Sequence, residues 1–210
     1  MRISILLAGL LVSTYGYTQA NEKPGLSDSA IVKKIKGTIK QFIRWTDNLG
    51  DNYLVLTVTD EIKSSAKISG SGLDCRGGCT DRELYAWHFI RKDSLLWKLT
   101  DFEKACSLNN VAEFRNSATK ITDLDKNGLA EIWIMYSTAC ITDPAPRTLK
   151  LIMYQGNKKY AIRGTSQSAR NKIDEKYGGK YMPDKEFESL SQPFKDFAQK
   201  LWSQHLYDLQ

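Results

Sequence analysis

The sequence predicts a mainly β protein: an antiparallel sheet or sandwich of about eight strands, with an amphipathic α-helix packed on it at the C-terminal end. Three observations predict this class. β-branched and aromatic residues alternate with polar ones through the middle of the chain, and short turn-forming stretches separate these segments at hairpin spacing. Near the C-terminus, apolar residues instead recur at three- and four-residue spacing, which is typical of a helix.

The chain begins with a pattern typical of a removable secretory signal. A basic residue precedes an apolar run over residues 3–12, and small residues near Ala20 mark an expected cleavage point. We therefore expect a signal peptide over residues 1–20 and a single β-rich domain over residues 21–210, since about 190 residues hardly suffice for two domains. No segment is apolar for long enough to remain as an integral membrane helix. The expected location is outside the cytoplasm, either periplasmic or extracellular.

The first predicted elements of the sheet are two hairpins. Residues 37–46 and 52–59 are rich in β-branched and aromatic side chains, and the stretch between them, residues 47–51, has the composition of a turn. Residues 83–91 and 94–100 form the second predicted pair. Four more strands are expected at residues 113–121, 130–138, 148–154 and 159–163.

The last predicted element is an amphipathic helix over about residues 192–208. Ser191 is a suitable N-cap, and Pro193 fits the first turn because its missing N–H would be unpaired there anyway. Phe194, Phe197 and Leu201 then recur at helical spacing. This apolar stripe should lie across one face of the sheet.

Four cysteines in an exported chain indicate disulfides, because the count is even and the compartment is oxidising. Three connectivities are possible. We favour a bond that closes the tight loop Cys75–Cys79, which leaves Cys106 and Cys140 to join the ends of two strands. The alternative is a four-cysteine zinc site, but its ligands usually come as two C-x2-C pairs, and here only one pair is close and has the wrong gap.

The charge pattern argues against a nucleic-acid-binding protein. Lys and Arg number 30 against 24 Asp and Glu, a net charge of +6, and the basic residues are scattered with acidic residues between them. Nucleic-acid binding normally needs a basic patch or stripe. The sequence shows none.

The stretch ITDLDKNGLAEIWIMY, residues 121–136, places oxygen-bearing side chains on alternate residues before a glycine and then a glutamate. In a tight loop these oxygens can converge, and Ca²⁺ takes six to eight oxygen ligands at about 2.3–2.6 Å. The alternative is a turn without metal, in which the Asp and Asn side chains accept hydrogen bonds from loop amides. The predicted calcium ligands are the side chains of Asp123, Asp125, Asn127 and Glu131 and the backbone carbonyl of Leu129.

This loop resembles the calcium loops of FG-GAP-type and related exported β-proteins, whose pattern is D-x-D-x-[DN]-G-x-x-[DE]. It is not an EF-hand, because strands rather than helices are expected on both sides. More widely, the chain over about residues 83–164 resembles a family of small exported bacterial proteins labelled surface-polysaccharide biosynthesis proteins. The resemblance is carried by residues 97–102, Cys106, residues 121–133, Cys140, residues 149–154 and residues 159–164. It implies an envelope-glycan context and no specific catalytic residue, and in that family cysteines matching Cys106 and Cys140 accompany the pattern.

A search for catalytic signatures finds none. The two histidines, His88 and His205, stand outside any nucleophile or metal motif. Sugar hydrolysis needs only two carboxylates at a suitable distance, which a sequence does not show. The candidates near predicted strand ends are Asp47, Asp60, Glu83 and Asp101.

Two functional classes follow. The first is an exported, non-catalytic module, stabilised by disulfides and calcium, that binds a surface glycan or an envelope protein. The second is an envelope-polysaccharide-active enzyme that uses a carboxylate pair. Because no catalytic signature is present, we favour the module.

Overall fold

The computed structural model describes residues 31, 33–68, 72, 74–91, 94–142, 145–167 and 178–207. The predicted signal peptide, residues 1–20, lies outside these residues. Over the described residues the chain forms two antiparallel sheets and a C-terminal helix, so the predicted fold class is confirmed.

The first sheet is built around β2 and β4. Its strands are β1 (Thr38–Asp47), β2 (Gly50–Val58), β3 (Ile62–Lys63), β4 (Thr80–Ile90) and β5 (Ser94–Cys106). They pair in the order β1-β2-β4-β3, and β5 pairs with β4 as well. Both predicted hairpins, β1–β2 and β4–β5, are therefore confirmed. The 3₁₀ turn η1 (Cys75–Gly77) lies between β3 and β4.

The second sheet has the order β11-β10-β9-β8-β6, with β7 also paired to β8. Its strands are β6 (Asn109–Phe114), β7 (Lys120–Thr122), β8 (Glu131–Ile141), β9 (Thr148–Gln155), β10 (Lys158–Thr165) and β11 (Tyr181–Pro183). Two helices follow β11, namely α2 (Lys185–Glu188) and α3 (Gln192–Gln204).

The prediction of one strand over residues 113–121 is wrong. β6 ends at Phe114, and the chain leaves the ladder for the 3₁₀ turn η2 (Asn116–Ala118) before β7 begins. The N–H of Ala118 donates to the carbonyl of Arg115, which closes this turn and buries the Ala118 side chain completely. β6 and β7 thus pair with the two ends of β8 in succession.

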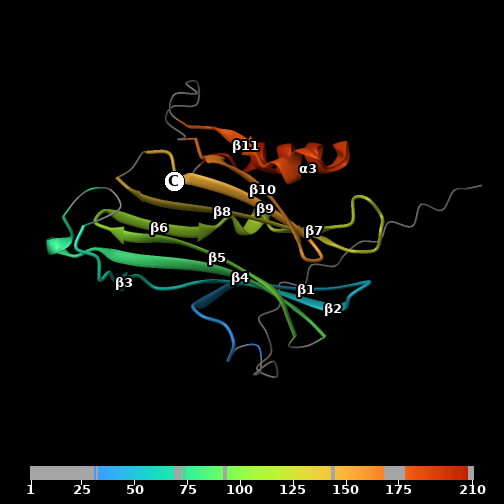
Figure 1. Cartoon of the computed structure of the whole chain (residues 1–210), viewed down its shortest axis with the longest axis horizontal. Helices are drawn as coiled ribbons and strands as arrows, with labels where there is room; N and C mark the ends of the chain where they lie inside the picture. The colour runs from blue at the N-terminus through green and yellow to red at the C-terminus, as the bar shows by residue number, and fades with distance from the viewer. Residues whose placement is uncertain are drawn as a thin grey trace, which may run out of the picture.

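The molecule has three layers: the first sheet, the second sheet and α3 (Figure 1). The main core lies between the sheets, where alternate residues of both point inward, as in other β-sandwiches. A second core lies between the other face of the second sheet and α3. Inward-facing core residues include Ile43, Trp45, Leu54, Leu56, Leu84 and Leu99 of the first sheet and Ile132, Ile134, Tyr136, Ile152 and Tyr154 of the second.

The packing of β8 explains why the stretch over residues 121–136 ends in an apolar run. Ile132 and Ile134 face the first sheet, whereas Trp133 and Met135 face α3. Since both faces of the strand are covered, both sets of alternate residues are apolar. Glu131, the first residue of β8, is charged and yet fully buried.

α3 packs on the second sheet as predicted, through Phe194, Ala198 and Leu201. Ser191 occupies the N-cap position, but its side chain accepts no capping hydrogen bond. The helix ends at Gln204 rather than at the predicted residue 208. Beyond it the backbone leaves the helical conformation at His205, and Tyr207 forms a β-bridge with Gln167, whose N–H donates to the carbonyl of Leu206.

Two disulfides are present, Cys75–Cys79 and Cys106–Cys140, which is the predicted pairing. The second joins the end of β5 in the first sheet to the end of β8 in the second. Disulfides of this kind indicate an oxidising compartment. Within the described part of the chain, no helix is both long and apolar enough to cross a membrane.

Candidate metal centre

The candidate site lies in the loop that joins β7 to β8. Lys126 and Gly128 both take positive φ, 56° and 80° respectively, so the backbone turns sharply at two points. Only glycine adopts such a conformation without strain. A Cβ at Gly128 would also displace the side chain of Asn48, whose Nδ2 donates to the carbonyl of Asn127.

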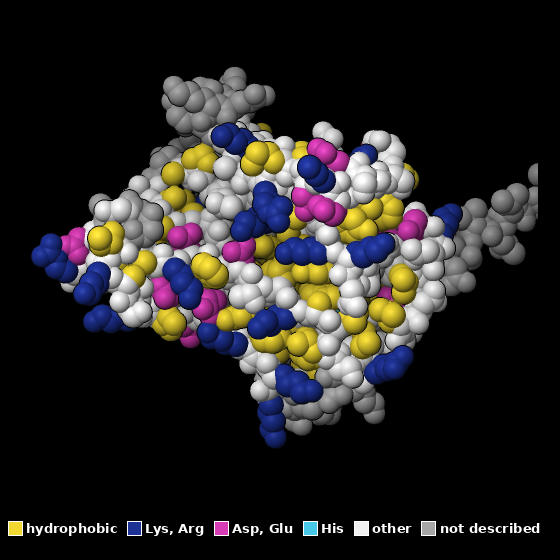
Figure 2. All heavy atoms as spheres, in the orientation of Figure 1, with side chains coloured by type: hydrophobic (Ala, Val, Ile, Leu, Met, Phe, Trp, Pro, Cys, Tyr) yellow, Lys and Arg dark blue, Asp and Glu magenta, His cyan; other side chains and the backbone are white. Residues whose placement is uncertain are grey.

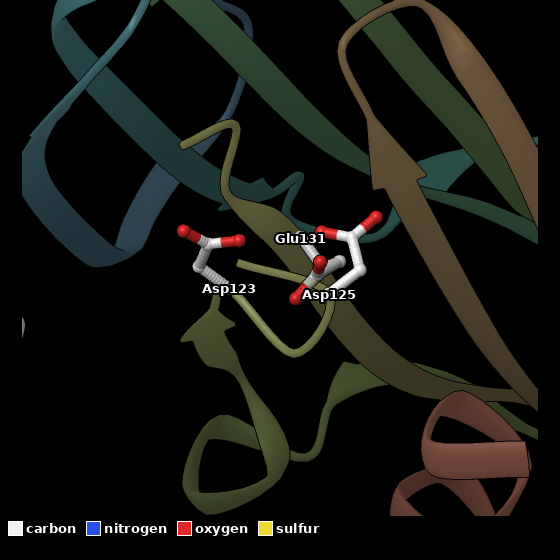
Figure 3. Close-up of side chains that lie close together, drawn as sticks. All are labelled: Asp123, Asp125 and Glu131. Atoms are coloured by element: carbon white, nitrogen blue, oxygen red, sulfur yellow. The ribbon is translucent and has the colours of Figure 1, made fainter. Parts of the chain in front are cut away.

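The bend brings three carboxylates together. Oxygens of Asp123, Asp125 and Glu131 all lie within 4.8 Å of one another, and Figure 3 shows the three side chains side by side over the loop. Two oxygens on opposite sides of one Ca²⁺ would be about 5 Å apart, because each bond measures about 2.3–2.6 Å. The three groups are therefore close enough to share a single ion.

Hydrogen bonds within the loop hold this arrangement. Asp123 Oδ1 accepts from the N–H of Asn127 at 3.0 Å, and its Oδ2 accepts from the N–H of Gly128 at 3.1 Å. Asp125 Oδ1 accepts from the same Asn127 N–H at 3.3 Å, and Asn127 Oδ1 accepts from the N–H of Leu129 at 2.7 Å. These are Asx-type bonds, and they fold the loop so that its carboxylates point to one place.

Glu131 is the least exposed of the three acids. Its Oε2 accepts from Thr122 Oγ1 at 2.7 Å and from the N–H of Leu124 at 2.9 Å. Burial nevertheless raises the pKa of Glu131, and the nearby Asp125 and Asp123 raise it further against the effect of those two bonds. The fold thus disfavours the charged form of this carboxyl.

No cation offsets this negative charge within the described part of the chain. None of the ion pairs formed there includes Asp123, Asp125 or Glu131. A bound metal ion would supply the missing charge and favour the ionised form of Glu131.

Gln155 belongs to the site, although sequence reasoning missed it. Its Nε2 donates to Asp125 Oδ2 at 3.1 Å and to Glu131 Oε1 at 3.2 Å. It comes from the end of β9, where it lies directly opposite Glu131 in the ladder. Only the register of β8 and β9 brings the two residues together, so no local pattern could have indicated this contact.

The loop is also attached to the other sheet. The backbone N–H of Asn48, in the β1–β2 turn, donates to the carbonyl of Gly128 at 2.9 Å, and its Nδ2 donates to the carbonyl of Asn127 at 3.1 Å. Asp47 Oδ2 accepts from the N–H of Ala130 at 3.1 Å. The candidate site therefore lies where the two sheets meet at one end of the sandwich.

The four carboxylates considered for catalysis do not form one site. Asp47 and Asp60 lie at opposite ends of β2. In the β4–β5 ladder Glu83 pairs with Phe102, the residue next to Asp101. Glu83 and Asp101 therefore face opposite sides of the first sheet. Ion pairs with lysines hold Glu83 in its charged form and lower its pKa to about 2.

His88 has a structural environment. It is buried between Trp45 and Trp97, and its Nε2 lies 2.8 Å from Asn52 Oδ1. Burial lowers the pKa of His88 to about 4, so the ring is neutral at ordinary pH.

Comparison with known protein families, curated proteins and solved structures finds no match for this chain.

Proposed function

We propose that the loop between β7 and β8 binds one Ca²⁺ ion, and that the protein is an exported, non-catalytic module that binds a surface glycan of the cell envelope. The observation that carries the calcium assignment is the convergence of Asp123, Asp125 and Glu131 with no cationic partner in the described chain. The two disulfides support an oxidising compartment for this module. The glycan is proposed from the family resemblance.

The donor set favours calcium over other metals. All of the groups that converge are oxygens of carboxylates, which hard cations prefer, and the described site holds no histidine or cysteine. Asn127 and Leu129 would complete the shell with a side-chain and a backbone oxygen. Rotation of the Gln155 amide would replace its Nε2 by Oε1 beside Asp125 and Glu131, which adds a further oxygen.

The role of the ion would be structural. It would clamp a loop whose backbone is already bonded to Asn48 of the β1–β2 turn, and so hold the two sheets together at that end. The carboxylates of Asp123, Asp125 and Glu131 all accept hydrogen bonds from backbone N–H groups of the same loop.

Calcium should raise the melting temperature of the protein and a chelator should lower it. An ion that binds only the folded state adds about 2.7 kcal/mol at a hundred times its dissociation constant, which is roughly 5–10 °C for a chain of this size. Mg²⁺ should have a much smaller effect, since it resists dehydration and needs a smaller octahedral shell. The measurement is calorimetric or fluorescence melting during a calcium titration.

Asp125→Ala should abolish this response, and Asp60→Ala is the matched control. Asp60 is exposed and follows β2 at the end far from the loop. Its replacement by alanine removes the same charge. Asp47 would be unsuitable as a control, because its Oδ2 bonds to the loop at Ala130. If millimolar calcium leaves the melting curve of the native protein unchanged, the loop is an Asx-type turn without metal.

Glu131→Gln should show the effect of the charge of Glu131 on stability, because glutamine has nearly the same shape and no charge. The raised pKa of Glu131 means that the metal-free fold loses stability as pH rises from the ordinary glutamate value, about 4.3, through the raised folded-state value. The variant lacks this titration, so its metal-free stability relative to the native protein should increase over the same pH range. It should also lose the calcium response. A parallel pH dependence of the two proteins in chelator would contradict the electrostatic argument.

The module and the enzyme differ in what they do to a polysaccharide. Incubation with envelope polysaccharide should produce no new reducing ends, because the four candidate carboxylates do not converge. The measurement is a colorimetric reducing-end assay over many hours, with a known polysaccharide hydrolase as the positive control. Release of reducing ends that grows with protein concentration would instead favour the enzyme.

A further inference from the structure

The two disulfides differ in how the fold holds them. Cys106 and Cys140 lie at or near the ends of β5 and β8, so strand pairing fixes both sides of that bond. The Cys75–Cys79 bond closes a loop with a sequence separation of only 4. A bond across so short a loop restricts the unfolded chain little and contributes less to stability. The two sheets should therefore persist when Cys75–Cys79 is reduced.

The two ends of the Cys75–Cys79 bond differ in exposure and in attachment. Cys79 is 2% exposed and directly precedes β4, and its carbonyl accepts from the N–H of Ser64 at 2.7 Å. Cys75 is partly exposed, and its N–H donates to the carbonyl of Lys67 at 3.4 Å, a longer bond. A thiolate must reach the sulfur that it attacks. Cys75 is therefore the end of the bond that a thiolate from solvent can reach.

A surface hollow of about 630 Å³ lies beside Cys75. Lys67 and Ile68 also line it, and Ile68 is 69% exposed. The loop is open on a second side, since a Cβ at Gly78 would meet no atom within 4 Å. Cys140 is partly exposed as well, but it does not line this hollow. A thiol-bearing segment of another molecule thus has room to approach Cys75.

The charge beside the hollow favours a thiolate. Asp74 lines the hollow, but its carboxylate bonds to the side chain of Arg76 and accepts from the N–H of Arg76 at 2.9 Å, so these two charges largely cancel. Lys67 forms no ion pair within the described part of the chain. A cation next to a thiol lowers the pKa of the thiol and so raises its thiolate fraction.

The loop lies at the end of the molecule away from the candidate metal centre. Figure 1 places η1, between β3 and β4, at the opposite end from the loop that joins β7 to β8. Figure 2 shows Lys and Arg side chains projecting from this end, next to acidic and hydrophobic ones. The two sites can therefore be tested separately.

We propose that Cys75–Cys79 is a thiol–disulfide exchange site for the vicinal dithiol of a redox protein, with Cys75 as the sulfur attacked. The open hollow accommodates the attacking segment, and Lys67 supplies the charge that favours its thiolate. Reduction opens the loop at residues 75–79, while Cys106–Cys140 continues to join the two sheets. The site is independent of calcium and of any glycan.

The exchange consists of two displacement steps. A thiolate of the dithiol attacks Cys75 Sγ, and the bond between the two Sγ atoms breaks as the new S–S bond forms. Cys79 leaves as a thiolate and takes a proton from water. The second thiolate of the redox protein then attacks the mixed disulfide, and Cys75 leaves and is protonated in turn. The dithiol is oxidised by two electrons to its own disulfide, and Cys75–Cys79 is reduced to two thiols.

The test exposes the native protein, with both disulfides formed, to reduced thioredoxin and maps the free thiols by alkylation and mass spectrometry. We expect thioredoxin to reduce Cys75–Cys79 at least about tenfold faster than Cys106–Cys140, with an unchanged circular dichroism spectrum. In a parallel reaction with glutathione, quenched in acid, the mixed disulfide should form on Cys75.

Lys67→Gln should slow the reduction roughly threefold, the effect of one exposed charge at short range in water. Lys158→Gln is the matched control. It removes the same charge from a position opposite Gln155, at the end of the sandwich that carries the β7–β8 loop. Equal rates for these two variants would overturn the role of the hollow.

Three further results would contradict the proposal. Equal rates for the two disulfides, or loss of the fold when Cys75–Cys79 is reduced, would overturn the exchange site. A glutathione adduct on Cys79 would overturn the direction of attack. Reduction by dithiothreitol but not by thioredoxin would overturn the class of partner, since only a small thiol would then reach Cys75.

Discussion

Removal of the Cys106–Cys140 disulfide should lower the free energy of unfolding by about 4 kcal/mol, and removal of Cys75–Cys79 by about 2 kcal/mol. The difference follows from loop length, because the sequence separations are 34 and 4 residues. The longer loop restricts the unfolded chain more. In the folded protein the same bond joins the two sheets, whereas Cys75–Cys79 closes only a local turn.

The measurement is urea unfolding of two double variants, Cys106→Ala/Cys140→Ala and Cys75→Ala/Cys79→Ala, each of which leaves no unpaired thiol. Each is the control for the other, since both remove two sulfur atoms and one bond. If the local pair proves as important as the long-range pair, loop entropy is not the main source of stability here.

Asp101→Ala should lower the free energy of unfolding by about 3 kcal/mol, because it leaves a mostly buried lysine without its counter-ion. Lys150 is bonded to Asp101 at 2.5 Å, and Tyr136 Oη loses its acceptor in the same variant. Addition of Lys150→Met should restore part of the loss, since the double variant no longer buries an unpaired charge. A double-mutant cycle by urea unfolding measures this coupling.

Asp51→Ala is the matched control for this cycle. Its carboxylate pairs with Arg44 at 3.4 Å, and both side chains are about half exposed, so the loss should be small. If Asp101→Ala is as mild as Asp51→Ala, or if Lys150→Met deepens the loss, the Asp101–Lys150 pair is solvated and the burial argument for this pair is wrong.

The candidate calcium loop was only partly visible in the sequence. The alternate spacing of Asp123 and Asp125 and the following Glu131 predicted a convergence of carboxylates, and the structure brings these three together. Gln155 could not be predicted, because it is positioned by the pairing of β8 with β9. Asn48 could not be predicted either, since its contact with the loop depends on how the two sheets pack.

The buried contacts of Asp101 with Tyr136 and Lys150 show the same limit. The sequence singled out Asp101 only as a carboxylate near a predicted strand end, because alternation along a strand does not reveal which face is the inner one. Only the contacts of Trp97 and Leu99 with the core identify the face, and only the ladder across β8, β9 and β10 brings Lys150 opposite β5.

The sequence by itself determined the features that depend on near neighbours in the chain. These are the mainly β class, the two hairpins, the start of α3 and the bend of the loop between β7 and β8, and in each the residues that interact are a few positions apart. Tertiary structure decided the break between β6 and β7, the end of α3, and the long-range partners of the β7–β8 loop and of Asp101. In those cases the deciding contacts join distant segments, as when Gln167 bonds to Leu206 at the point where the helix stops. Local propensity is weak compared with burial and backbone pairing of this kind, so long-range contacts override it.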